Sequence, residues 1–350
     1  MKLDDLLKRT SEWLKGEGPK SEIVVSSRVR LARNLDKMPF SHWAKPDQKE
    51  EVLQKVKNAI EKSGYLKGSM FFRVDELSEV DRQFLIERHL MSKEHATNPR
   101  HKAIDLDNKE VVSVMINEED HVRAQVMQSG FNLLDVWHMI EKIDAELAQH
   151  LDYAYSARLG YLTACPTNVG TGMRASCMLH LPALVFSKQI NKVLQAVSKL
   201  NLAVRGLYGE GTEATGNFFQ ISNQVSLGLK EEDIIDNLEK IMNQVVVREE
   251  SARAGILAKN KEEITDRTFR ALGTLKNAYI ISSSETNRLL SNIRLGVDLG
   301  ILKHIDRGFV NELLIITQPA HLQKLEKKVL SPKERDVIRA QIIRERLNKA

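Results

Sequence analysis

The sequence contains few cysteines, few aromatic residues and no long apolar run. Its two cysteines, Cys165 and Cys177, are too few for a disulfide framework or a four-ligand zinc site. Aromatic residues make up 5% of the chain, so the core must consist mainly of Leu, Ile and Val. No run of about 18 apolar residues exists, which excludes a membrane-spanning helix. The first 18 residues resemble a short amphipathic helix rather than a signal peptide. These absences predict a cytoplasmic protein.

The positive charge of the chain is small and unevenly placed. The net charge is +5, and the segment from His321 to Ala350, with nine Lys/Arg and four Asp/Glu, accounts for all of it. A nucleic-acid-binding protein usually has a broader basic region with interleaved aromatic residues. We therefore interpret the basic end as a solvated helix face and do not expect a nucleic-acid partner.

Changes of pattern divide the chain into two parts. From Ser21 to about Val247, β-branched runs such as Val111–Asn117 and Gly216–Gln224 alternate with apolar residues at helical spacing. This alternation predicts an α+β domain in which helices pack on a largely antiparallel sheet. After about Ser251 only helical patterns remain, and the last helix begins with a capping box at Ser331. We expect an α+β domain over residues 1–252 and an all-helical domain over residues 253–350.

Four segments of the first domain combine glycines, arginines and carboxylates next to expected strands. They are VVSSRVRLAR (24–33), NEEDHVRAQ (117–125), YLTACPTNVGTGMRAS (161–176) and RGLYGEGTEATGNFFQ (205–220). Strand alternation places Arg28 and Arg30 on one face, where two guanidinium groups repel unless an anion lies between them. The third and fourth segments are glycine-rich loops that can approach or cover phosphates. The third lacks the Gly-Lys-Ser/Thr ending of a Walker A loop.

Each segment alone also fits a simpler interpretation, such as a solvated basic strand or an acidic loop. Together they supply cations for a triphosphate, a mobile cover and carboxylates for an acceptor, which are the requirements of phosphoryl transfer. In this order and at comparable spacing, the four segments resemble the catalytic domain of phosphagen kinases such as creatine kinase and arginine kinase. The resemblance covers about Ser21 to Arg253. It implies that the chain uses ATP and Mg²⁺ to phosphorylate a guanidino group.

The resemblance implies three catalytic residues. A guanidinium group has a pKa of about 12.5–13.8, so it must be oriented and deprotonated before it attacks phosphorus. Glu119 corresponds to the family's base, and Glu213 corresponds to a second carboxylate that grips the acceptor. Cys165 corresponds to a cysteine beside the acceptor, where neighbouring cations would lower its pKa and favour the thiolate. A small buried thiol is the alternative for Cys165.

The resemblance also implies a nucleotide-binding set. Its phosphate-binding arginines are Arg28, Arg30, Arg123, Arg174 and Arg205. His89 aligns with a histidine that stacks on adenine, although a histidine on a helix surface is the alternative. Met178 replaces a second family histidine. The neighbouring residues in these motifs complete the set, with Cys177 itself expected to be a buried thiol: Ser26, Ser27, Val29, Ala175, Ser176, Cys177, Gly206, Leu207, Tyr208, Gly209 and Glu210. We expect no protein metal cage, because Mg²⁺ on phosphates keeps mostly water ligands.

The order of the domains resembles that of bacterial protein-arginine kinases. Phosphagen kinases have a small helical domain before the catalytic one, whereas here about 20 residues precede the match and a helical domain follows it. The RDxxRA motif of protein-arginine kinases matches Arg335, Asp336, Arg339 and Ala340. The resemblance implies that residues 253–350 dock substrates, dimerise and bind phosphoarginine at this motif. A surface helix with ordinary charge pairs is the alternative for the motif.

The resemblance further implies partners. They are proteins with exposed arginines as substrates, a second copy of the chain, a zinc-binding activator protein, and a Clp ATPase and protease that degrades the marked substrates. Two other functions remain open. One is a kinase for free arginine or another small guanidino compound, and the other is a non-catalytic adaptor.

Overall fold

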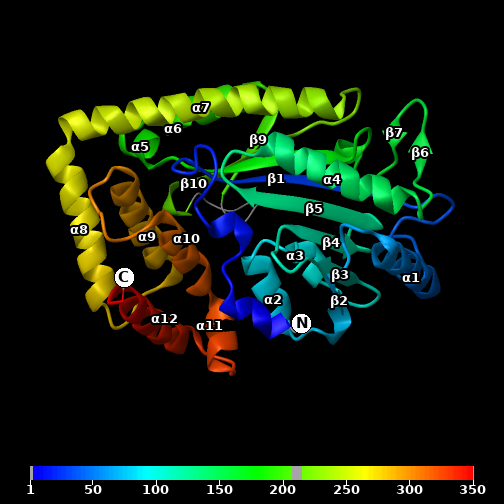
Figure 1. Ribbon diagram of the computed structural model, residues 1–350, viewed down its shortest axis with the longest axis horizontal. Helices are drawn as coiled ribbons and strands as arrows, with labels where there is room; N and C mark the ends of the chain where they lie inside the picture. Colours follow the sequence, from blue (N-terminus) through cyan, green and yellow to red (C-terminus); the bar gives the residue numbers. More distant parts are fainter. Residues whose placement is uncertain (1–2, 207–214, 350) are drawn as a thin grey trace.

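Figure 1 presents the computed structural model of the protein, in which residues 3–206 and 215–349 are described. The centre is an eight-stranded antiparallel sheet with the order β2-β3-β4-β5-β1-β8-β10-β9. Its strands are β1 (Val24–Arg33), β2 (Met70–Arg73), β3 (Ala103–Leu106), β4 (Val112–Ile116), β5 (Val122–Ser129), β8 (Met173–His180), β9 (Leu202–Arg205) and β10 (Phe218–Asn223). A separate hairpin is formed by β6 (Tyr155–Ser156) and β7 (Gly160–Tyr161).

The helices surround this sheet and continue beyond it to the end of the chain. They are α1 (Pro46–Lys62), α2 (Glu79–Glu87), α3 (Lys93–Ala96), α4 (Leu133–Ala148), α5 (Pro182–Phe186), α6 (Ile190–Lys199), α7 (Glu231–Lys259), α8 (Lys261–Asn277), α9 (Ser283–Asp298), α10 (Arg307–Ile316), α11 (Pro319–Glu326) and α12 (Pro332–Leu347). Short 3₁₀ helices are η1 (Leu3–Lys8), η2 (Glu12–Leu14), η3 (Val74–Glu76), η4 (Pro166–Asn168) and η5 (Thr215–Asn217). The predicted α+β class and the helical C-terminal part are confirmed.

The N-terminal segment differs from the amphipathic α-helix that we expected. It forms two 3₁₀ helices separated by a short link. Within this link, the Arg9 carbonyl and the Ser11 hydroxyl both accept hydrogen bonds from Arg88 at the end of α2. The polar groups of the link therefore bond to another part of the fold instead of continuing a helical ladder.

The two faces of the sheet are covered differently. Helices α1, α4 and α7 pack on one face and enclose the largest apolar cluster, to which β1 contributes Val24, Val29 and Leu31. On the opposite face, η1 and α2 cover β2 to β4, and Phe84 of α2 is part of this apolar cluster. On the same face, η2, α9 and α10 cover the other end of the central strands. Figure 1 shows the C-terminal helices gathered at one end of the molecule, with the N-terminus beside α11 and α2. A cavity occupies the middle of this second face.

Helix α7 runs continuously through the boundary that we expected at residues 252 and 253. It extends along the top of the molecule in Figure 1 and ends at Lys259. Around the boundary, Arg253 donates to the Glu249 carboxylate within α7, to the Glu22 carbonyl before β1 and to Asp298 in α9. These buried contacts join the sheet and the C-terminal helices through the same helix.

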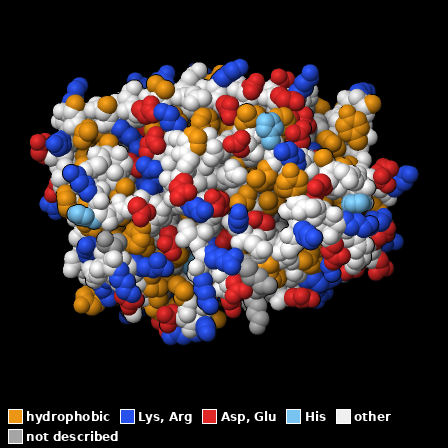
Figure 2. All heavy atoms as spheres, viewed as in Figure 1, with side chains coloured by type: hydrophobic (Ala, Val, Ile, Leu, Met, Phe, Trp, Pro, Cys, Tyr) orange, Lys and Arg blue, Asp and Glu red, His pale blue; other side chains and the backbone are white. Residues whose placement is uncertain are grey.

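The exposed surface mixes charges of both signs. On the face shown in Figure 2, acidic and basic side chains are interspersed, and this face has no broad basic region. No helix within residues 3–206 and 215–349 is both long and apolar enough to cross a membrane.

Candidate active site

The floor of the cavity is built by the register of five neighbouring strands. Because side chains alternate across a strand, Arg28 and Arg30 lie on the face opposite Val29. Arg30 pairs directly with Gln125 of β5 and with Arg174 of β8, so these side chains share one face. On the same side, Gln220 of β10 pairs with Arg205 of β9. Residues far apart in the sequence therefore meet on one polar surface of an otherwise apolar sheet.

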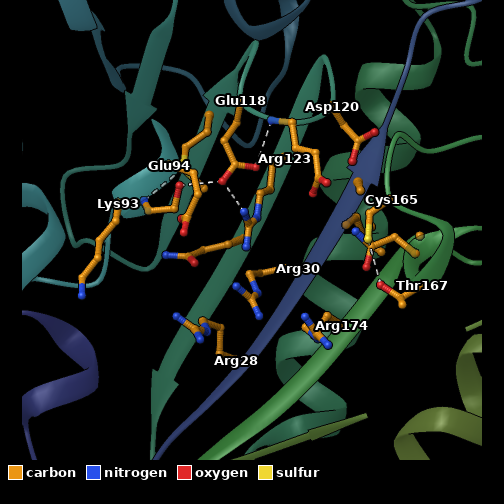
Figure 3. Close-up of a pocket in the computed structure, with 18 of the residues that line it drawn as sticks. Arg28, Arg30, Lys93, Glu94, Glu118, Asp120, Arg123, Cys165, Thr167 and Arg174 are labelled. Atoms are coloured by element: carbon orange, nitrogen blue, oxygen red, sulfur yellow. Dashed lines mark hydrogen bonds and ion pairs between the residues drawn. The ribbon is translucent and has the colours of Figure 1, made fainter. Parts of the chain in front are cut away.

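This surface forms the bottom of a cavity of about 720 Å³. The cavity brings together eight of the predicted site residues: Arg28, Arg30, His89, Glu119, Arg123, Cys165, Arg174 and Arg205. In Figure 3 the labelled arginines lie at the centre, Glu118 and Glu94 lie on one side, and Asp120 and Cys165 lie on another. The prediction that Arg28 and Arg30 share a face is confirmed.

The guanidinium groups of Arg28 and Arg30 lie in a strongly positive environment. Burial, followed by the charges of Arg123, Arg174 and Arg205, lowers the pKa of Arg28 to about 10. Burial and the neighbouring charge of Arg28 also lower the pKa of Arg30 well below its ordinary value. Among the described residues neither forms an ion pair; Arg28 donates instead to the neutral Gln220 amide, at 3.0 Å. A multivalent anion such as a triphosphate fits this site because it would relieve the mutual repulsion.

The carboxylates follow β4, at one side of the cavity. Glu118 pairs with Arg123 and accepts the Ser92 hydroxyl at 2.6 Å. Burial alone would raise the pKa of Glu118, but the charge of Arg123 and these hydrogen bonds outweigh it and lower the pKa to about 2. Burial, together with the charges of Asp120 and Glu118, raises the pKa of Glu119 above its ordinary value. The two adjacent carboxylates therefore differ: Glu118 is held as an anion beside an arginine, while Glu119 is a stronger base.

Asp120 holds the neighbouring loops in place. Its carboxylate accepts hydrogen bonds from the Asn34 amide and from the backbone N–H of Ala164. The second contact lies next to Cys165, whose Sγ is 3.1 Å from the Thr167 hydroxyl. Within the described ranges, no three His, Cys, Asp or Glu side chains converge as a metal site.

The loop that carries Cys165 is held close to another backbone segment. The Ser226 hydroxyl donates to the carbonyls of Thr167 and Val169. Gly170 has a φ of +110°, and a Cβ added there would lie 2.7 Å from the Ser226 carbonyl oxygen. Glycine is therefore required at this position by both backbone conformation and space.

His89 borders the cavity immediately after α2. Its backbone has a φ of +58°, and its carbonyl accepts a hydrogen bond of 2.7 Å from the Gln125 amide. Burial, followed by the charge of Arg28, lowers the pKa of His89 to about 3. The imidazole is therefore neutral near pH 7 and presents an uncharged ring to the cavity.

Several predicted binding residues do not line the cavity. Val29, Ala175 and Cys177 lie in the apolar core on the other face of the sheet, because each alternates with a cavity-facing residue. Burial raises the pKa of the Cys177 thiol to about 12, as expected for a buried thiol. The prediction that these three residues bind the nucleotide is therefore corrected: their side chains pack in the core.

The other predicted binding residues are distributed as follows. The Ser27 hydroxyl bonds to the Gly130 carbonyl, and the Ser176 hydroxyl is 3.5 Å from the Arg28 carbonyl. Met178 packs with Phe218 under the C-terminal helices. Ser26 and Gly206 are buried and do not line the cavity. Five predicted residues lie outside the described ranges: Leu207, Tyr208, Gly209, Glu210 and Glu213.

Other cavity residues were not predicted. Gln125 and Gln220 bond to His89 and Arg28, and Glu118 pairs with Arg123. The exposed side chains of Lys93 and Glu94 in α3 line the cavity as well. The acidic motif around Glu118 was visible in the sequence, but its partner could be identified only from the fold.

The RDVIRA motif lies in α12, away from this cavity. The predicted capping box at Ser331 is confirmed, since Glu334 and Ser331 bond reciprocally. Arg339 is buried, donates to the carbonyls of Thr317 and Ile281, and pairs with Asp336. Arg335 and Asp336 are partly exposed, and Ala340 is buried. Arg339 therefore fixes α12 against the preceding helices, and phosphoarginine binding at this motif stays a prediction.

Comparisons with known proteins agree with this geometry. The family model of the ATP:guanido phosphotransferase C-terminal catalytic domain matches residues 51–252, and that of the protein-arginine kinase McsB C-terminal domain matches residues 261–350. The protein-arginine kinase of Halothermothrix orenii is 49% identical over 349 residues, which are 99% of this chain and 100% of that protein. That of Desulforamulus reducens is 48% identical and covers 97% of this chain and 96% of its own length.

Solved structures of two other kinases share the fold. Lombricine kinase has a TM-score of 0.61 and 26% identity, covering 69% of this chain and 70% of its own. The duplicated taurocyamine kinase from Schistosoma mansoni, with bound transition-state-analogue components, has a TM-score of 0.62 and 28% identity. It covers 67% of this chain, which spans 34% of that duplicated protein. The chain described here belongs to the protein-arginine kinase family and is an ATP-dependent guanidino phosphotransferase.

Proposed function

We propose that the protein transfers the γ-phosphoryl group of ATP to the guanidino groups of arginine side chains in other proteins. The observation that carries the proposal is the layout of the cavity. Cations from four strands form its floor, and a carboxylate edge that includes Glu118 and Glu119 lines it together with Cys165. Such a site can hold a polyphosphate and a cationic acceptor side by side.

The arginine floor would bind and orient the phosphates. Planar guanidinium groups form paired hydrogen bonds with phosphate oxygens, and the fixed sheet register holds them in position before ATP arrives. Arg28 and Arg30 stand ready for this role because neither forms an ion pair with any described residue. Mg²⁺ bound with ATP would neutralise part of the phosphate charge. Carboxylate oxygens of Glu118 and Asp120 would accept hydrogen bonds from its water ligands.

The carboxylate edge would prepare the acceptor. A guanidino nitrogen forms a bond to the γ-phosphorus, the bond to the β–γ bridging oxygen breaks, and ADP leaves. The nitrogen's proton passes to Glu119, whose raised pKa suits a general base. Cys165 would contact the acceptor guanidinium. It lies directly after Ala164, whose backbone N–H donates a hydrogen bond to Asp120. We also propose Glu213 as the second gripping carboxylate, on the basis of its motif position alone.

A protein substrate is supported by three observations. Relatives that are 48–49% identical over nearly the whole chain are named protein-arginine kinases. Residues 261–350 match a domain model of that family as well. Exposed Lys93 and Glu94 at the edge of the cavity are accessible to residues that flank a substrate arginine. Free arginine would use the same chemistry without needing these outer contacts.

We further propose that phosphorylation marks proteins for a Clp protease, that a zinc-binding activator protein stimulates the kinase, and that the chain forms a dimer. We also propose that Arg335, Asp336 and Arg339 bind phosphoarginine. These four proposals are supported by the resemblance of the C-terminal part to protein-arginine kinases.

The main proposal is tested by supplying ATP and Mg²⁺ with either a loosely folded protein or free arginine. We expect acid-labile phosphate on arginine side chains of the protein, located by mass spectrometry under non-acidic conditions. Glu119→Gln serves as the inactive control. Faster transfer to free arginine than to the protein would replace the main proposal with a small-molecule kinase.

A further inference from the structure

His89 is held in a backbone conformation that a residue with a Cβ rarely adopts. Its φ of +58° is in the left-handed region, and such a conformation persists only where surrounding contacts over-determine it. Two contacts within the sheet domain are evident. The His89 N–H donates to the Ile86 carbonyl, and its carbonyl accepts from Gln125. Both hydrogen bonds are made by the backbone of His89.

One contact of the imidazole ring comes from the N-terminal segment. Trp13 in η2 lies against His89 in a T-shaped arrangement, with ring centroids 5.2 Å apart and planes at 82°. Trp13 is 1% exposed and packs among Val25, Met127 and Leu313. Its indole Nε1 is buried without a hydrogen-bond partner among the described residues. The indole is thus held by packing alone, and one of its neighbours is a cavity-lining ring.

Hydrogen bonds to a buried ion pair attach the same segment to the residue before His89. Arg88 is 2% exposed and binds both carboxylate oxygens of Glu110. Arg88 also donates to the Arg9 carbonyl and the Ser11 hydroxyl, and Ser11 in turn donates to Glu110 at 2.8 Å. Residues 9–13 therefore contact two consecutive residues at the end of α2, Arg88 through hydrogen bonds and His89 through its ring.

The C-terminal helices close the other side of this junction. The Glu87 carboxylate accepts the backbone N–H groups of Ala320 and His321 at the start of α11. The Asn311 amide in α10 donates to the Leu14 carbonyl, next to Trp13. The position of the N-terminal segment is thus fixed by both the sheet domain and the C-terminal helices.

We propose that the N-terminal segment is part of the nucleotide-binding site and that Trp13 is a positioning residue, which holds the His89 ring toward the base of the bound nucleotide. The inference rests on ATP being bound in the cavity. The arginines would bind the phosphates, whereas an uncharged imidazole suits the face of an aromatic base. Trp13 therefore acts on the part of the ligand that the arginine floor does not reach.

The test compares two ligands of the purified full-length protein. Calorimetry measures the affinity for a non-hydrolysable ATP analogue, which has a base, and for inorganic tripolyphosphate, which has none. Because an aromatic contact is lost, Trp13→Leu is expected to weaken binding of the ATP analogue by about three- to tenfold. Tripolyphosphate affinity is expected to stay within about twofold, because the arginine floor is unchanged. In turnover assays KM for ATP rises while kcat at saturating ATP is retained.

A double-mutant cycle separates positioning from general destabilisation. In the His89→Ala background, Trp13→Leu should cause no further loss of analogue affinity, because the ring that it positions is absent. Trp137→Leu is the matched control. Trp137 is a buried tryptophan in α4 on the other face of the sheet. Its replacement should lower Tm without changing the ratio of the two affinities.

A second measurement leaves Trp13 intact. The chain has three tryptophans, so Trp43→Phe with Trp137→Phe makes Trp13 the sole tryptophan. Its fluorescence should change on binding the ATP analogue and remain constant with tripolyphosphate. The proposal would be overturned if Trp13→Leu weakened binding of both ligands equally. It would also be overturned if Trp13→Leu still lowered analogue affinity in the His89→Ala background, or if the two ligands changed the fluorescence equally. Failure of protein-arginine transfer is distinct, because the calorimetry and fluorescence assays contain no acceptor.

Discussion

Asp105 is a carboxyl group buried in β3, away from the cavity. It pairs with Phe71 and Val114 on neighbouring strands and is 1% exposed. Neither carboxylate oxygen has a hydrogen bond of good geometry among the described residues, and the nearby Ser69 hydroxyl offsets only part of the cost of burial. Burial raises the pKa of Asp105 from its ordinary value of 3.8 to about 6. We predict that Asp105→Leu stabilises the protein, and that the gain depends on pH.

The magnitude follows from this shift. Because the folded-state pKa is the higher one, the folded protein binds the proton more tightly, and stability falls as pH rises from about 4 to about 6. The shift is about 2 pKa units, which at about 1.4 kcal/mol per unit gives a cost of about 3 kcal/mol above pH 7. At pH 4.5 the same relation leaves a cost of about 1 kcal/mol. Asp105→Leu removes the ionisable group and therefore this difference.

Thermal unfolding at pH 8 and at pH 4.5 provides the assay. With an unfolding entropy of about 2.1 cal/mol/K per residue, a gain of about 3 kcal/mol corresponds to a Tm increase of about 4 °C at pH 8. The increase should be clearly smaller at pH 4.5. Glu141→Leu, which removes an exposed carboxylate from α4, controls for the change in net charge. An equal Tm change for Asp105→Leu at both pH values would refute the reasoning.

Three further predictions concern the reaction and the C-terminal motif. Glu119→Gln should lower kcat by about 10²- to 10⁴-fold with little change in KM for ATP, because a general base is lost; near-normal turnover in steady-state assays would remove Glu119 from the mechanism. Replacing Arg123, Arg174 or Arg205 by lysine should nearly abolish transfer, because a point charge cannot replace a planar group that donates paired hydrogen bonds. Wild-type rates in all three lysine variants would mean that these arginines are structural. Asp336→Ala, in the Glu119→Gln background, should weaken phosphoarginine binding at least about tenfold in calorimetry, since a charged acceptor is lost; unchanged affinity would place the second site elsewhere.

Local patterns predicted the parts of the site that depend on one strand. Alternation alone placed Arg28 and Arg30 on one face, and β1 confirms this. Alternation also places Val29 and Cys177 toward the core, whereas the motif resemblance covers whole segments and does not distinguish their two faces. The helical C-terminal part followed from the loss of strand signals after Ser251, and α8 to α12 confirm it.

Contacts between distant elements could not be predicted from the sequence. Gln125 and Gln220 enter the site through the pairing of β1 with β5 and of β10 with β9, and register is not encoded in either strand alone. The contact between Trp13 and His89 joins two segments that are far apart in the sequence. In α12, the spacing of Arg335 and Arg339 indicated a shared face, but the burial of Arg339 depends on the carbonyls of Ile281 and Thr317.

The register of β1 also determines which mutations the strand can tolerate. Its ten residues encode both the apolar core, through Val29, and the phosphate-facing surface, through Arg28 and Arg30. Substitutions can alter one function at a time. A deletion or insertion of one residue within β1 would instead turn the arginines into the core and the aliphatic side chains into the cavity. Sequence drift in this strand is therefore restricted to replacements, and length variation between relatives is expected in the loops at its two ends.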